Sequence, residues 1–136
     1  MMRNALLAAL VVVLSACGAY SFPGGATSPS PDTGSVSGRV VAVPCAPVEQ
    51  VGSPCPGRPV AGTEIDYIAG TRVAGRTVTD KTGNYSIKLD PGTYTVKLNI
   101  YMRLISGPTK IAVAAGSNTR ADYVLDSGIR VPVAQQ

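Results

Sequence analysis

The chain has 136 residues, a formal net charge of +4, three cysteines and no histidine. This length accommodates one domain with its own hydrophobic core. The basic residues are scattered and are not interleaved with aromatic residues, which argues against a nucleic-acid surface. The lack of histidine excludes Ser–His–Asp and Cys–His catalysis and any His-ligated zinc site. We therefore expect no metal, no cofactor and no nucleic-acid partner.

The N-terminal segment has the layout of a secretory signal. A short basic start ending at Arg3 is followed by ten apolar residues, Ala5 to Leu14, and then by small residues. The segment closes on a tetrapeptide that resembles the lipobox of bacterial lipoproteins: Leu14, Ser15, Ala16 and Cys17. The resemblance implies that a diacylglycerol is attached to the thiol of Cys17 and that residues 1–16 are removed as a signal peptide.

Other interpretations of this segment can be weighed. A transmembrane helix needs roughly 18 to 20 apolar residues, which is more than the run provides. A buried core helix is disfavoured because no residue caps the segment and turn-forming residues follow it. An ordinary secretory signal cut after Ala19 stays open as an alternative. The lipobox predicts a protein of the cell envelope, exposed on the extracytoplasmic side and bound to membrane lipid through acylated Cys17.

Residues 17–35 consist of the lipidated Cys17 and a stretch dense in Gly, Pro, Ser and Thr. Such a composition buries too little apolar surface to offset its ordering entropy, so it predicts a flexible linker. Eighteen residues of this kind have a root-mean-square reach on the order of 25 Å. The expected organisation is signal peptide 1–16, linker 17–35, domain 36–131 and tail 132–136.

Short β runs separated by turn-forming residues begin at Val36. Apolar and polar residues alternate with a period of two, most clearly from Tyr85 to Leu89 and from Tyr94 to Ile100. Together with the frequent turns, this pattern predicts an all-β, seven-stranded antiparallel sandwich. The expected strands are Val36 to Val43, Thr63 to Ile68, Val73 to Thr79, Tyr85 to Leu89, Thr93 to Ile100, Thr109 to Ala114 and Thr119 to Leu125.

Two turns separate the central strands. In the first, Asp80 is placed to accept hydrogen bonds from backbone amides and Gly83 to adopt a positive φ. In the second, Pro91 presets φ and Gly92 closes the turn. These turns lie within the segment TDKTGNYSIKLDPGTYTVKL.

That segment resembles the carboxypeptidase regulatory-like domain, a small transthyretin-like sandwich. The family pattern has an Asp–x–x–Gly–x–aromatic hairpin followed by a Pro–Gly–x–Tyr turn. GSVSGRVVAV resembles its first strand, GRPVAGTEIDY its approach to the second and LDSGIR a common ending. The resemblance covers residues 34–131 and implies a transthyretin/immunoglobulin-like sandwich. Domains of this family are noncatalytic companions of other domains.

Cys45 and Cys55 flank a Pro-rich loop between the first two expected strands. In an exported protein, two thiols ten positions apart predict a disulfide. Zinc is the alternative, but it prefers four ligands with close paired spacing. Lipidation explains why Cys17 is left unpaired.

Paired carboxylates are the one enzymatic arrangement that the sequence leaves, because glycoside hydrolysis uses two of them. Glu64 with Asp66, and Asp122 with Asp126, have same-face spacing on a strand. We expect all four to be solvent-facing polar positions and the protein not to be an enzyme. Asp80 with Asn84 has too few carboxylates for a calcium loop.

Exposed aromatic side chains would allow binding instead. Tyr85, Tyr94 and Tyr123 lie on apolar rows and are expected in the core, whereas Tyr67 is ambiguous. Tyr101 interrupts its row and is the best candidate for an exposed ligand contact. We expect a monomeric, noncatalytic structural or interaction module with an envelope protein or glycan as partner. The alternative is a carbohydrate-binding module with Tyr67 or Tyr101 as its platform.

Overall fold

The computed structural model describes residues 32–49 and 51–130. The expected signal peptide, Cys17 and the tail 132–136 lie outside these residues, as does the linker up to residue 31. The described part is all-β, and none of it forms a helix that is long and apolar enough to cross a membrane.

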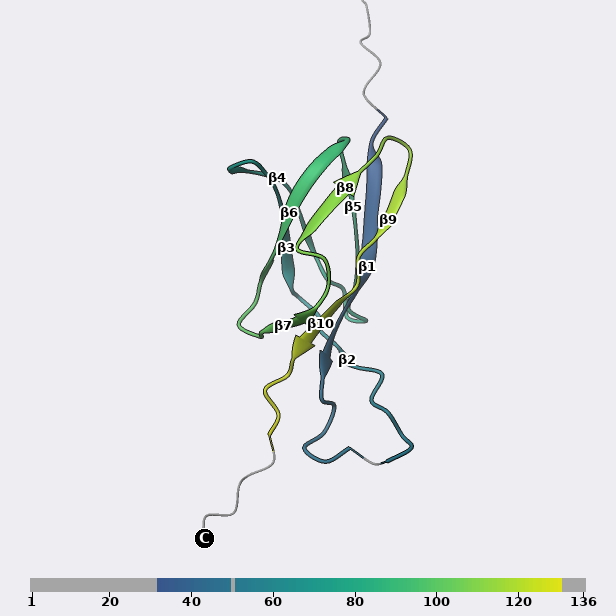
Figure 1. Cartoon of the computed structure of the whole chain (residues 1–136), viewed down its shortest axis with the longest axis vertical. Coiled ribbons are helices and arrows are strands. Elements are labelled where there is room, and N and C mark those ends of the chain that lie inside the picture. Colours follow the sequence, from purple (N-terminus) through teal and green to yellow (C-terminus); the bar gives the residue numbers. More distant parts are fainter. Residues whose placement is uncertain (1–31, 50, 131–136) are drawn as a thin grey trace, which may run out of the picture.

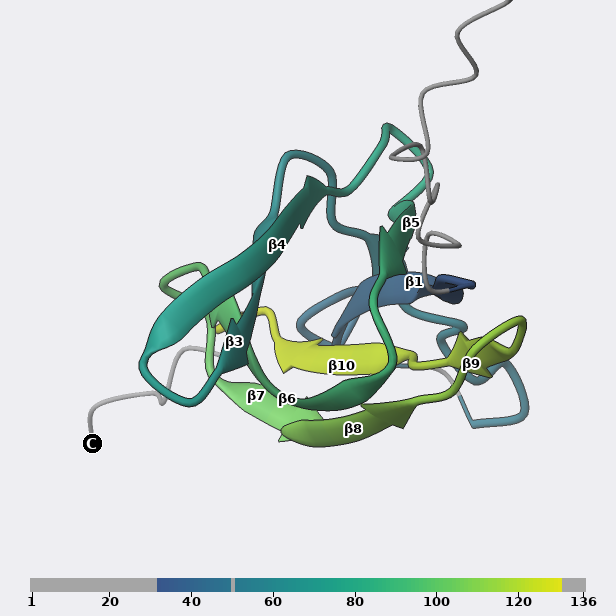
Figure 2. The ribbon, with the colours of Figure 1, turned by 90° about the horizontal axis from the view of Figure 1, so that it is seen from above.

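Ten strands form two sheets that enclose a common core (Figures 1 and 2). One sheet has the order β4-β3-β6-β8, and the other is built around β1, with the order β2-β1-β10-β7 and with β5 and β9 also paired to β1. The strands are β1 (Gly34–Val43), β2 (Arg58–Pro59), β3 (Glu64–Ala69), β4 (Arg72–Val78), β5 (Asn84–Leu89), β6 (Gly92–Asn99), β7 (Leu104–Ser106), β8 (Lys110–Val113), β9 (Asn118–Arg120) and β10 (Tyr123–Asp126).

Strand β1 runs the length of the molecule and changes partners halfway (Figure 1). Its first half pairs with β5 and β9, and its second half pairs with β2 and β10. The pairings with β9 and β10 are parallel, so the sheet is mixed. The two-sheet all-β prediction is confirmed, whereas the prediction of seven strands, all antiparallel, is wrong in both number and direction.

The expected single strand from Thr119 to Leu125 is divided into β9 and β10. Both pieces keep one register along β1, since Ser35 lies opposite Asn118 and Val40 opposite Tyr123. The ladder is interrupted at Asp122, whose carboxylate Oδ1 accepts the backbone N–H of Arg39 at 2.8 Å. A side-chain acceptor thus takes the place of a backbone carbonyl at the point where β1 changes partners.

Strands β2 and β7 were not expected from the sequence. They contain two and three residues. Such lengths are too short to show alternation, and β2 includes Pro59, which has no backbone N–H to donate.

The core confirms the predicted alternation. Tyr85, Tyr94 and Tyr123 are buried as expected. Each tyrosine hydroxyl donates to a backbone carbonyl, which satisfies the polar end of a mostly apolar side chain: to Ala121, to Asp90 and to Pro108, respectively. The buried apolar residues that surround them include Val36, Val40, Ile65, Val96, Ile111, Val113 and Leu125.

The turn before β5 has the predicted chemistry. Asp80 Oδ1 accepts the backbone N–H groups of Thr82 at 2.8 Å and Asn84 at 3.0 Å. It also accepts the Thr82 hydroxyl, and this bond, followed by the backbone bonds, lowers the pKa of Asp80. Gly83 adopts a φ of +77°. Asp80 is therefore engaged with its own turn.

Candidate functional site

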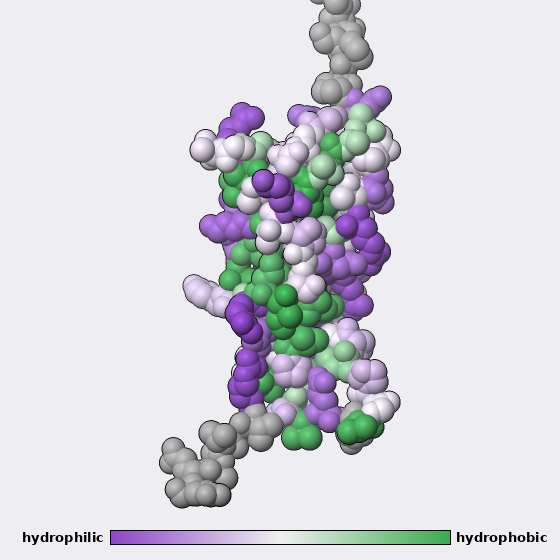
Figure 3. Space-filling view, in the orientation of Figure 1, coloured by the Kyte–Doolittle hydropathy of each residue, from purple (hydrophilic) through white to green (hydrophobic). Residues whose placement is uncertain are grey.

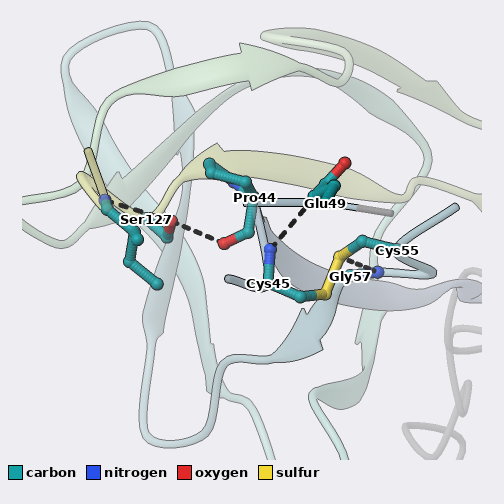
Figure 4. The surroundings of a disulfide bond; sticks show 7 residues. Pro44, Cys45, Glu49, Cys55, Gly57 and Ser127 are labelled. Carbon is teal, nitrogen blue, oxygen red and sulfur yellow. Dashed lines mark hydrogen bonds between the residues drawn. A yellow bond between two sulfur atoms is a disulfide. The ribbon is translucent and has the colours of Figure 1, made fainter. Parts of the chain in front are cut away.

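The predicted disulfide between Cys45 and Cys55 is present, with the two Cα atoms 5.8 Å apart (Figure 4). The bridged loop leaves the end of β1 and returns to β2. Gly57, just after the bridge, is buried, and a Cβ there would lie 2.7 Å from the side chain of Val41. The end of the loop therefore covers an apolar side chain on the outer face of β1.

Ser127 joins this loop to the segment after β10. Its backbone N–H donates to the carbonyl of Val43 at 2.8 Å. Its hydroxyl donates to the carbonyl of Pro44, also at 2.8 Å (Figure 4). The hydroxyl also accepts the N–H of Ile129 at 3.4 Å. These bonds hold residues 127–129 against the end of β1.

Tyr101 lies in the loop between β6 and β7. Ile100 before it is half-buried against the core, whereas Tyr101 itself is 109 % exposed and Met102 is 37 % exposed. The expectation that Tyr101 is the exposed aromatic residue is consistent with this position.

From the sequence, Tyr67 is a candidate ligand contact, which would require an exposed ring. It is fully buried on β3. A ring enclosed in the core offers no face on which a sugar could stack, so we remove Tyr67 as a candidate contact.

Two adjoining hollows lie at the end of the sandwich that holds Tyr101. The first has a volume of about 280 Å³ and lies between β2, Met102 and the segment after β10; its lining includes Arg58, Val60 and Ile129. The second has a volume of about 320 Å³ and is lined by Tyr101, Arg103 and Asp126, among others. Met102 and Ser127 line both hollows, so together they form one surface.

The carboxylate of Asp126 in the second hollow is engaged in ion pairs and a hydrogen bond with neighbouring residues. Arg130 Nη2 lies 2.7 Å and Arg103 Nη2 lies 3.4 Å from its carboxylate, and the N–H of Gly128 donates to it at 2.9 Å. The hydrogen bond from Arg130, followed by that from Gly128, lowers the pKa of Asp126. Asp122 and Asp126 were predicted to lie on one face of a single strand. They do not share a strand, because Asp122 lies between β9 and β10 and Asp126 ends β10.

Glu64 and Asp66 do lie on one face of β3, but Asp66 is only 5 % exposed. Arg76 Nε donates to Asp66 Oδ1 at 2.6 Å, and Asn99 Nδ2 donates to Oδ2 at 2.8 Å. The hydrogen bond from Arg76, followed by that from Asn99, lowers the pKa of Asp66. The expectation that Asp66 is solvent-facing is therefore wrong, because side chains from β4 and β6 cover it.

This network favours a structural role for Glu64 and Asp66. The same Arg76 lies 3.3 Å from Glu64, and Asn99 donates to both carboxylates. A general acid of a glycosidase needs a raised pKa, whereas the pKa of Asp66 is lowered. Elsewhere in residues 32–49 and 51–130, no three His, Cys, Asp or Glu side chains are grouped so that they could hold a metal ion.

No protein-family model matches the sequence, and no curated protein sequence is significantly similar to it. The residues themselves must therefore carry the functional interpretation. Sequence reasoning identified Tyr101 but missed Arg58, Met102 and Ile129. They come from three separate segments, and no local pattern marks them.

Proposed function

We propose that this protein is a surface lipoprotein that displays a noncatalytic β-sandwich as a structural or interaction module at the cell envelope. The lipobox at Leu14–Cys17 behind its apolar run is the observation that carries the proposal. The flexible composition of the linker and the disulfide of the described domain are in keeping with an exported, tethered protein. We further propose that the sandwich is of the transthyretin-like, carboxypeptidase regulatory-like type and is monomeric.

The anchor can be tested with Cys17→Ser. The wild-type chain is expected to incorporate radioactive palmitate and to fractionate with membranes, whereas Cys17→Ser loses the label and is not cut before residue 17. A Cys45→Ser/Cys55→Ser variant is the matched control and keeps the label, since it retains the lipobox. Labelling that persists in Cys17→Ser, or a mature N-terminus at Tyr20, contradicts the lipid anchor.

A carbohydrate-binding module is the second candidate, and the exposure of Tyr101 beside a hollow favours it. Sugar rings stack on exposed aromatic faces, so Tyr101→Ala is expected to lower glycan affinity about two- to tenfold, as loss of about 0.5 to 1.5 kcal/mol of stacking implies. The measurement is binding of the full chain to a glycan array, followed by titration of any hit. No binding on the array, or unchanged affinity in Tyr101→Ala, removes this candidate.

A further inference from the structure

We infer that the two adjoining hollows form a docking surface for an extended segment of a partner protein that carries a bulky apolar side chain beside a carboxylate. This inference deepens the proposed function. It rests on that function only in so far as the proposed anchor would place the surface at the cell envelope. We call the surface the distal face and define it by Arg58, Tyr101, Met102, Arg103 and Ile129.

The distal face is apolar where a partner side chain would enter. The first hollow is lined by side chains that include Ala42, Pro59, Val60 and Met102. Ile105 on β7 is 51 % exposed. Figure 3 shows apolar surface over β7 and β10 in the same half of the molecule. A hollow lined mainly by apolar residues with a few polar groups is typical of a binding site.

The charge of the distal face favours an anionic group on the partner. Arg58 lines the first hollow and makes no hydrogen bond or ion pair through its side chain with any other residue in the described part of the chain. Around the second hollow, Arg103 and Arg130 share the single carboxylate of Asp126. The Arg103 and Arg130 side chains are 79 % and 63 % exposed, against 12 % for Asp126.

The polar groups nearby do not offset this charge or suit a sugar. Ser127 uses its hydroxyl and its N–H within the fold, as described above. Glu49 is not part of either lining and accepts the N–H of Cys45 in its own loop. A sugar needs several directed hydrogen-bond partners, whereas the first hollow offers mainly apolar side chains and one guanidinium. A carboxylate on an apolar peptide matches this set better.

The position of the face also favours a partner other than the anchoring membrane. β1 begins at Gly34, on the side of the proposed tether, and reaches the first hollow at Ala42. Eight residue steps of a strand cover roughly 26 Å. Figure 1 shows β2, β7 and β10 gathered at this far end of β1. A domain tethered at Cys17 would therefore carry the distal face at the end opposite its linker, where a partner other than the anchoring lipid can reach it.

The test uses the full chain in detergent and an array of nine-residue peptides. Each peptide has a central Leu or Phe with Asp or Glu one to three positions away, and its matched control carries Asn or Gln there. We expect the acidic peptides to bind about fivefold more tightly than their controls, the size expected for a partly exposed ion pair. Arg58→Gln should reduce this preference to less than twofold, and Met102→Ala should weaken both sets.

Arg72→Gln is the matched control variant, because Arg72 is also an exposed arginine on a strand but lies on β4, away from both hollows. It should keep the full preference. Equal binding of acidic and control peptides, or a full preference in Arg58→Gln, overturns the inference, as does binding only to glycans or to anionic vesicles. Palmitate labelling is scored separately, so a failed anchor and a failed docking surface are distinguishable.

Discussion

Replacing Gly38 with alanine is expected to lower the free energy of unfolding by about 2 to 3 kcal/mol. A Cβ at this position would overlap the backbone carbonyl of Ala121. The carbonyl carbon would lie at 2.6 Å and the Tyr85 hydroxyl oxygen at 3.0 Å. Gly38 therefore allows β1 to approach the junction between β9 and β10 more closely than a residue with a side chain could.

The neighbours of Gly38 are unable to move away without losing other bonds. The N–H of Ala121 donates to the carbonyl of Ser37 at 2.9 Å, and the carbonyl of Ala121 accepts the Tyr85 hydroxyl. On either side of this point, the parallel pairings hold the same register. Relief of the overlap would thus disturb a buried tyrosine and both halves of the ladder.

The measurement is urea unfolding of Gly38→Ala beside Gly92→Ala. Gly92 also lies in a strand. A Cβ there would lie 3.6 Å from its nearest neighbour, the hydroxyl oxygen of Tyr94, which is an ordinary van der Waals distance. The Gly92 variant should therefore change stability by no more than about 0.5 kcal/mol. Equal effects of the two variants would show that the junction tolerates a side chain at Gly38.

Removing the disulfide with Cys45→Ser/Cys55→Ser is expected to lower the free energy of unfolding by about 2 to 3 kcal/mol. The bridge closes a loop with a sequence separation of 10, which limits the conformations of the unfolded chain. In the folded state, Gly57 just after the bridge packs against the side chain of Val41. For a domain with a typical total stability of about 5 to 15 kcal/mol, this loss is large.

The unfolding midpoint in urea, with and without a reductant, checks this expectation. The wild-type chain should lose stability on reduction, whereas the double serine variant should be unaffected by the reductant. Wild-type stability that is unchanged by complete reduction would mean that the bridge does not contribute to stability. Palmitate labelling of the same variant shows whether the chain is still exported and processed.

Local patterns predicted the central strands to within a residue or two. Tyr85 to Leu89 and Thr93 to Ile100 alternate because one face of each strand is buried, and the burial observed on β5 and β6 follows that alternation. The turn chemistry of Asp80 and Gly83 was also predictable, because it depends on the residues of the turn itself. The pairing of Cys45 with Cys55 followed from the number of cysteines and the exported setting.

Contacts between distant segments were not predictable in this way. Asp66 has the spacing of a solvent-facing residue, yet Arg76 and Asn99 from neighbouring strands cover it. Tyr67 shares a row with Ile65, but only the opposing sheet determines that its ring is fully enclosed. The distal face likewise combines residues from three segments that lie far apart in the sequence, at Arg58, at Tyr101 to Arg103 and at Ile129.

The sequence by itself determined an all-β domain with a two-residue period, its main turns and its cysteine pairing; the leader on which the proposed anchor rests stays a prediction. Each of these depends on residue type and spacing within a short stretch of chain. Only the tertiary structure decided that β1 pairs in parallel with β9 and β10, that Asp122 caps Arg39 between them, and that Arg58 and Met102 meet at one surface. Parallel pairing and shared surfaces join residues far apart in the chain, and no local periodicity records which segments will meet.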